Sequence, residues 1–345
     1  MKPIGNLIEF IQVIQKKDIA DNNTYYENLR MTKDEIQKKE ELVSELHKFV
    51  VEKGNLEDIM FLFKDHFSVL YKYKMLESYK GKNNSIPLRR FFYRGISNNK
   101  HNLVSGVYRK TERHDEFYYC NEINVRCPEV FRRYQNLDKL VYMQHYGCPT
   151  RLLDITSNPL VSLYFACSGN IEQDGSVYIF GINEEDIRYA QSDRIHMLSK
   201  LSELKRSEQI DLFFLAYENI LKGKFPQDSH GKYKDILVER FYHAIKRENG
   251  AFEREIVPFD LLKPQFVQPY KDNPRILKQD GAFIVSGLDI DEEDSDRKIR
   301  HYMVNEIIID KNAKKQILNE LEDVGINKAT LFPEVDKVAE YLKGK

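Results

Sequence analysis

The chain contains no tryptophan, few cysteines and no long apolar run. Its four cysteines include no CxxC pair, and no metal-ligand spacing joins them to the nine histidines, so we expect reduced core thiols and no metal site. No stretch approaches the roughly 18 apolar residues of a membrane span. The start of the chain lacks the pattern of a secretion signal. These absences predict a cytoplasmic protein with no membrane partner.

Neither sign of charge is in excess, because 53 basic residues stand against 54 acidic ones. Composition therefore demands neither a nucleic-acid nor a membrane partner. The motifs GxxxxGK, HExxH and GxSxG are also absent, which removes support for a nucleoside triphosphatase, a zinc peptidase or a serine hydrolase. The chain is rich in aromatic residues, with 21 tyrosines and 20 phenylalanines. Its length of 345 residues is enough for one large or two modest domains.

Residues 1–85 show apolar positions at helical spacing. The pattern predicts helices at about 4–16, 32–51 and 55–80. Thr32 followed by Glu35 is typical of a capping box at the start of the second helix, and residues 81–85 are typical of a linker. This helical region could be a cap packed on the rest of the chain or an arm that binds a partner. The simpler interpretation, that the apolar stripes are core positions, is favoured.

The remainder of the chain mixes strands and helices. We expect strands at about 90–95, 175–181, 253–258, 282–286 and 302–309, and helices at about 115–135, 137–146, 157–168, 311–324 and 333–343. Residues 184–247 are predicted to be a helical insertion. The acidic run at 289–296 is predicted to be a solvated loop, because its carboxylates repel one another.

Polar and charged residues are concentrated in an otherwise apolar stretch, residues 139–167. Because a buried charge is costly unless it is paired, Arg151 and Asp154 are candidates for a mutual ion pair. His145 lies within this stretch. A lone histidine near a core is more often structural than catalytic, but His145 remains a candidate acid–base residue.

A second dense segment, residues 89–110, places Arg94 at the end of an aromatic strand pattern and follows it with Gly95. A glycine allows backbone or ligand to come close, and the guanidinium fork suits a phosphate or a carboxylate. Arg109 could anchor an anion in the same way from the second half of the segment.

Five segments together carry a family resemblance: FYRG at 92–95, VYR at 107–109, QHYGCPTRLLDITSNPLVSLYFA at 144–166, RILKQDGAFIV at 275–285 and ATLFPEVDKVAEYL at 329–342. They resemble the FRG domain, named for a Phe-Arg-Gly motif that is Tyr93-Arg94-Gly95 here. The resemblance extends over about 86–345 and leaves 1–85 as a helical N-terminal region. FRG domains are mostly modules of bacterial and phage proteins, without an established reaction.

The same blocks resemble, more distantly, ADP-ribosyltransferases of the arginine, serine and glutamate class. This implies an α+β fold with a small, split β-core covered by many helices, and NAD as the substrate. In that class the Tyr-Arg-Gly strand holds the NAD phosphates, and a hydroxyl, here Thr156 or Ser157, supports the nicotinamide end. Tyr93 and Tyr164 would stack on the base.

Gln279 is the nearest candidate for the catalytic glutamate of that class. A glutamine carries no negative charge to stabilise an oxocarbenium ion, although Asp280, Glu253 or Glu255 could supply one. The implied catalytic residues are Arg94, Ser157, Gln279 and His145; the implied cofactor-binding residues are Tyr93, Arg94, Gly95, Arg109, Arg151, Thr156, Ser157 and Tyr164.

Three functions are therefore open. The first is an enzyme that uses NAD to modify a macromolecule, protein or nucleic acid, as a toxin or phage-defence effector. The second is a non-catalytic module that binds a nucleotide or nucleic acid. The third is a structural protein in which the polar cluster only fixes the fold. A carboxylate within reach of Arg94 and Ser157 in the folded chain would favour the enzyme, and its absence would favour the binding module.

Overall fold

A computed structural model describes residues 3–15, 31–51, 56–79, 89–110, 113–131, 134 and 136–344. Its strands are β1 (Arg89–Ile96), β2 (Leu152–Thr156), β3 (Gly175–Asn183), β4 (Ile187–Tyr189), β5 (Gln265–Gln268), β6 (Gly281–Val285) and β7 (Met303–Ile309). They form one sheet in the order β4-β5-β6-β2-β1-β3-β7, in which only the β4–β5 pair is parallel. The predicted α+β class is confirmed. The strands belong to one continuous seven-stranded sheet, not to the small, split β-core that was expected.

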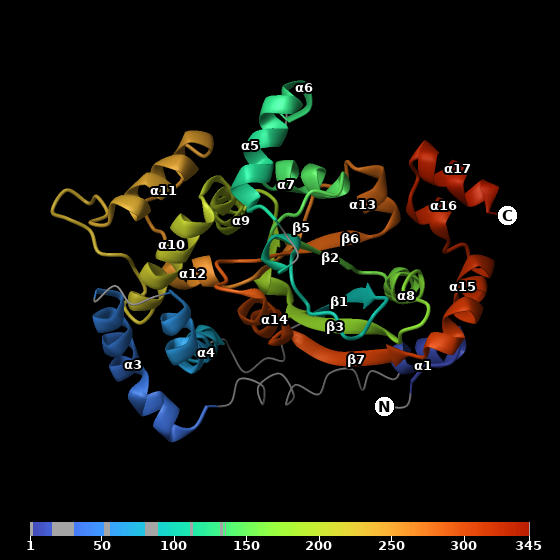
Figure 1. Cartoon of the computed structure of the whole chain (residues 1–345), viewed down its shortest axis with the longest axis horizontal. Helices are drawn as coiled ribbons and strands as arrows, with labels where there is room; N and C mark the ends of the chain where they lie inside the picture. The colour runs from blue at the N-terminus through green and yellow to red at the C-terminus, as the bar shows by residue number, and fades with distance from the viewer. Residues whose placement is uncertain are drawn as a thin grey trace.

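Helices cover both faces and both ends of this sheet (Figure 1). The longer ones are α1 (Leu7–Gln15), α3 (Lys33–Val51), α4 (Leu56–Tyr79), α5 (Glu116–Arg126), α7 (Asn136–His145), α8 (Pro159–Cys167), α9 (Asp193–Lys200), α10 (Arg206–Glu218), α11 (Ile236–Glu248), α14 (Glu292–Arg300), α15 (Lys314–Asp323) and α17 (Val335–Lys343). The short ones are α6 (Pro128–Phe131), α12 (Pro258–Leu262), α13 (Pro274–Lys278) and α16 (Lys328–Leu331). Helices α1, α8 and α15 lie together at the β7 side of the molecule.

The sheet separates two hydrophobic cores. Because successive side chains of a strand point to opposite faces, Phe92 of β1 enters the larger core and Tyr93 enters the smaller one. The larger core receives side chains from α4, α7 and α9–α12. The smaller core lies between the sheet and α1, α8 and α15. The two cores fix which residues of β1 face which helices.

The helical N-terminal region packs on the rest of the chain. Ile4 bridges to Ile309 of β7, and α1 enters the smaller core. Tyr71 of α4 is buried in the larger core. The predicted capping box is confirmed, because the amide of Glu35 donates to Thr32 Oγ1 at 3.1 Å and the amide of Thr32 donates to Glu35 Oε2 at 2.6 Å. The predicted linker at 81–85 lies outside the described residues.

Two local predictions were wrong. Residues 253–258 form no strand; the sheet continues instead through β4 and β5, which the sequence pattern did not reveal. The acidic run 289–296 is no solvated loop, because most of it enters helix α14. Carboxylates are favourable in the first turn of a helix. Buried Lys298 also offsets their repulsion, with its Nζ 2.9 Å from Asp289 and 2.8 Å from Asp294.

The four cysteines differ in exposure. Cys120 and Cys167 are buried as expected, and burial raises the pKa of each thiol to about 12. Cys127 is exposed, so it is not the core thiol that was predicted. In the described part of the chain, no helix has the length and apolar character needed to cross a membrane.

Candidate functional site

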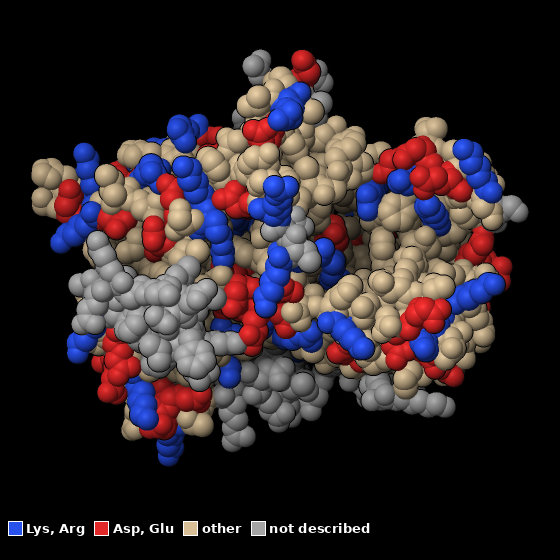
Figure 2. Space-filling model, viewed as in Figure 1, with Lys and Arg blue, Asp and Glu red and all other residues tan. Residues whose placement is uncertain are grey.

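Three adjacent strands bring together the segments singled out in the sequence. Tyr93 of β1 is paired with Thr156 of β2, and Thr156 is paired with Gly281 of β6. The end of β2 therefore lies between Arg94 on one side and the Gln279–Asp280 segment on the other. The molecular surface is hollowed beside this region, between the centre of the molecule and the C-terminal helices α16 and α17 (Figure 2).

Arg94 connects the first two of these strands. Its Nη1 donates to the backbone carbonyl of Asp154 at 2.5 Å. Its Nε is buried and has no hydrogen-bond partner among the described residues. Burial lowers the pKa of Arg94, the charge of Asp154 opposes this, and the charge of Arg109 adds to it. A half-buried guanidinium with an unused donor, close to a second arginine, is suited to an anion.

Gly95 is required by the packing of α8 on β1. A Cβ atom at this position would lie 1.8 Å from the carbonyl oxygen of Ser162 and 2.7 Å from the amide of Ala166. Gly175 of β3 makes a similar close approach, with a Cβ position 2.4 Å from the carbonyl oxygen of Ala166. The glycine after Arg94 therefore lets a helix, not a ligand, approach the strand.

The two hydroxyls at the end of β2 differ. Thr156 is buried, and its Oγ1 donates to the carbonyl of Gln279 at 2.7 Å and accepts from the amide of Asn158 at 3.0 Å. Ser157 is exposed, and its hydroxyl makes only a 3.4 Å contact to the carbonyl of Asp280. Of the two hydroxyls that the sequence left open, that of Ser157 is the one exposed to solvent.

The two residues between α13 and β6 supply an amide and a carboxylate. Gln279 ends α13, and its Nε2 donates to the carbonyl of Leu331 at 3.0 Å. Asp280 has a left-handed backbone, with φ at +46°, and its carboxylate lies 3.5 Å from Asn158 Nδ2 and 3.6 Å from Lys271 Nζ. The amide of Gln279 is thus used within the fold, while the Asp280 carboxylate remains at the surface beside Ser157.

A second carboxylate, that of Asp154, acts on Arg94 through its charge. Asp154 is the one exposed residue in the otherwise buried strand β2. It shares a small cavity of about 80 Å³ with His145 and Gln279. The sequence analysis did not identify Asp154 as an exposed acid of the site, because it assigned Asp154 to an ion pair with Arg151. An acid alone in an apolar strand pattern was the available signal. Glu253 and Glu255 line none of the cavities described here; they lie between α11 and α12.

Arg151 does not pair with Asp154, contrary to the prediction. It pairs with Glu116 of α5: Nη2 lies 2.6 Å from Oε2, and the Arg151 amide donates to Oε1 at 2.8 Å. Both residues are almost completely buried. Arg151 therefore has no surface to offer a cofactor, and its charge serves to hold α5 against the start of β2.

The other implied cofactor residues lie apart from Arg94. Tyr93 and Tyr164 belong to the smaller core, on the opposite face of the sheet, and are 7% and 9% exposed. Burial raises the pKa of both phenols. Arg109 lines a separate basic cavity of about 810 Å³ with Arg113 and Lys205 among others. It still acts on Arg94 through its charge.

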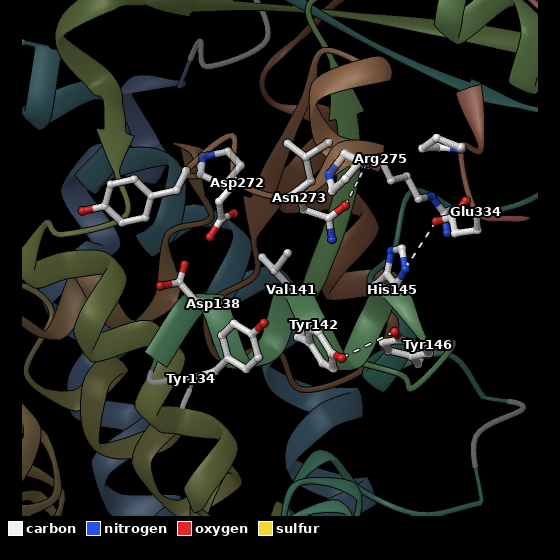
Figure 3. Close-up of a pocket in the computed structure, with 15 residues that line it drawn as sticks. Tyr134, Asp138, Val141, Tyr142, His145, Tyr146, Asp272, Asn273, Arg275 and Glu334 are labelled. Atoms are coloured by element: carbon white, nitrogen blue, oxygen red, sulfur yellow. Dashed lines mark hydrogen bonds and ion pairs between the residues drawn. The ribbon is translucent and has the colours of Figure 1, made fainter. Parts of the chain in front are cut away.

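His145 ends α7 and has its Nε2 3.3 Å from Glu334 Oε1. Burial and the charge of Arg275 lower the pKa of His145, and Glu334 partly opposes them. His145 also lines a larger cavity of about 330 Å³ between α7 and α13 (Figure 3). That cavity could not be predicted from the sequence, because its tyrosines come from segments more than 120 residues apart. Its walls include Tyr134, Asp138, Tyr142, Tyr146, Tyr270 and Asp272.

The described residues contain no group of three or more histidine, cysteine, aspartate or glutamate side chains arranged to hold a metal. The fold and the site define a mixed α+β domain in which a helix packs closely on the strand that carries an Arg-Gly pair.

The family model of the FRG domain matches residues 89–175, so the chain carries an FRG domain. The match runs from β1 to the first residue of β3; it includes Arg94 and Asp154 but not Gln279. No curated protein and no solved structure matches the chain.

Proposed function

We propose that this FRG-domain protein binds NAD beside β1, β2 and β6 and transfers ADP-ribose from it to a macromolecule. The observation that carries the proposal is the adjacency of three strands, with Arg94, Ser157 and Asp280 at or next to their ends and Asp154 beside Arg94. Two different acids lie next to the two residues: Asp154 is beside Arg94, and Asp280 is beside Ser157.

The residues have roles that suit this chemistry. Arg94, with its unused Nε, would hold the pyrophosphate, and the nearby charge of Arg109 would help to neutralise it. The exposed Ser157 hydroxyl would orient the ribose. As the bond from the ribose carbon to nicotinamide breaks, the Asp154 or Asp280 carboxylate would stabilise the cationic sugar. The acceptor nucleophile then bonds to the same carbon and loses its proton, and nicotinamide leaves as a neutral molecule.

A second function is favoured by one observation. Gln279 stands where the catalytic glutamate is expected, and its side chain is bound to the carbonyl of Leu331. A domain with the phosphate anchor but without that glutamate could bind a nucleotide and not turn it over. In both functions Arg94 would hold the nucleotide. They differ in whether the bound nucleotide reacts.

Calorimetric titration of NAD into the protein, followed by mass spectrometry for nicotinamide and ADP-ribose adducts, separates the two. Binding with release supports the transferase, and binding without release supports the module. Arg94→Ala should abolish binding, and Arg94→Lys should weaken it because the forked donor is lost. Arg247→Ala, at a largely exposed arginine on α11, is the control. Absence of NAD binding by the folded protein would contradict the transferase and would exclude NAD as the nucleotide of the module.

A further inference from the structure

Tyrosines and acids line the cavity between α7 and α13 (Figure 3). The proposed NAD-binding function does not use this cavity. Its volume of about 330 Å³ lies within the range of small-molecule sites. We call it the tyrosine pocket, and define it by Tyr134, Asp138, Tyr142, Tyr146, Tyr270 and Asp272, which line it with nine other residues.

Three of the tyrosines form a row: Tyr142 is on α7, Tyr134 lies just before this helix and Tyr146 just after it. The rings of Tyr134 and Tyr142 are stacked, with centroids 4.7 Å apart and planes at 25°. The ring of Tyr146 follows with its centroid 4.9 Å from that of Tyr142. Aromatic ring faces attract cations, most strongly where water is partly excluded. A row of rings at one wall of a cavity is thus a surface for a planar or alkylated cation.

Two carboxylates complete the negative character of the pocket. Those of Asp138, on α7, and Asp272, just before α13, point toward one another across it (Figure 3). Burial and the charge of Asp272 raise the pKa of Asp138. Two acids held face to face repel one another, and a cation placed between them would relieve the repulsion.

The remaining charged groups of the pocket leave it negative. Glu334 Oε1 lies 3.3 Å from His145 Nε2, and Glu334 Oε2 is buried without a partner among the described residues. Against these three carboxylates stand the guanidinium of Arg275, 4.7 Å from the ring centroid of Phe332, and His145, whose lowered pKa keeps it mainly neutral at pH 7. An anion is therefore disfavoured here.

We propose that the tyrosine pocket binds an organic cation, the guanidinium or alkylammonium group of a basic side chain. It adjoins the small cavity that contains Asp154, with which it shares Val141, His145, Asn273, Arg275 and Ile276 as walls. If the proposed transfer takes place, this position suits the part of a protein acceptor that the domain recognises. The binding itself needs no NAD and does not rest on the transfer.

The test is calorimetric titration of Nα-acetyl-arginine amide into the full chain without NAD, at low ionic strength. Its neutral isostere, Nα-acetyl-citrulline amide, should bind at least about tenfold more weakly, because a charged hydrogen-bonding partner is lost. Nα-acetyl-lysine amide shows whether the cation is guanidinium or ammonium, and binding of either supports the proposal. Equal binding of the citrulline compound, or no binding of either cation to folded protein, overturns it.

Variants locate the site. Asp138→Asn and Asp272→Asn should each weaken binding about tenfold, and both should fold because each removes a like-charge repulsion. Glu172→Gln, at an exposed acid in the loop after α8, should leave binding unchanged. Unchanged affinity in the Asp138→Asn/Asp272→Asn double variant would place the cation elsewhere and overturn the proposal. Because no NAD is present, cation binding and NAD binding can fail separately.

Discussion

The guanidinium of Arg94 donates to the backbone carbonyl of Asp154, although sixty positions separate the two residues in the chain. This bond crosses from β1 to β2 and leaves the Asp154 carboxylate exposed in a strand that is otherwise buried. A half-buried guanidinium and an exposed acid thus share one place in the sheet.

Replacing Asp154 by asparagine should separate binding from reaction. The bond from Arg94 goes to the main chain, so Asp154→Asn should keep the fold and NAD affinity. Nicotinamide release should fall about 100-fold if this carboxylate stabilises the cationic sugar. Asp280→Asn is the comparison, because asparagine tolerates the left-handed backbone at that position. Unchanged release in both variants, measured by chromatography, would exclude both carboxylates from the reaction.

Gly95→Ala should destabilise the protein by about 3 kcal/mol or more, because the new methyl group would meet the backbone of α8 and not a movable side chain. Urea unfolding measures the loss. Gly250→Ala is the matched control, since a Cβ atom there has nothing within 4 Å. Equal urea midpoints for the two variants would show that α8 can move away from β1 without loss of stability.

Glu116→Gln should lower the free energy of unfolding by about 3–5 kcal/mol, because it leaves the buried charge of Arg151 without a counter-charge. Glu122→Gln, on the same helix, breaks a largely exposed pair with Arg126 and should change stability by less than about 1 kcal/mol. Chemical denaturation of both variants at neutral pH makes the comparison. A small effect for Glu116→Gln would mean that the buried arginine finds other acceptors.

His301 should make the fold sensitive to acid. Burial, with the charge of Arg297 next, lowers its pKa from 6.5 to about 4, so the folded state favours the neutral ring. The unfolded chain binds the proton first. Stability is therefore complete above about pH 6.5 and falls as the pH drops toward 4, by up to about 3 kcal/mol.

Denaturation of the wild type and of His301→Gln at several pH values tests this. The variant should lose less stability between pH 7 and pH 4 than the wild type does. His230→Gln, at an exposed position, is the control and should follow the wild type. Parallel pH profiles for His301→Gln and the wild type would rule His301 out as the cause.

Local patterns predicted most of the elements. The capping box at Thr32, the strand at 175–181 and the helix at 137–146 follow from short-range periodicity and capping chemistry, and the structure has all three with small shifts in their ends. The failures come from segments whose partners are distant. The acid run 289–296 becomes a helix because Lys298 and the helix dipole stabilise carboxylates that repel one another when considered alone.

By itself, the sequence determined the mixed class of the protein, its FRG-domain segment and the density of polar groups around Arg94 and residues 144–158. Only the tertiary structure decided the partners. In the folded chain Arg151 pairs with Glu116 of α5, and the Gln279 side chain donates to the carbonyl of Leu331 of α16. Asp154 stays exposed in the otherwise buried strand β2. Folding also assembled the tyrosine pocket from α7 and the α13 region. A residue's type and spacing limit its chemistry, but the energy of a charge depends on what burial and long-range packing place beside it.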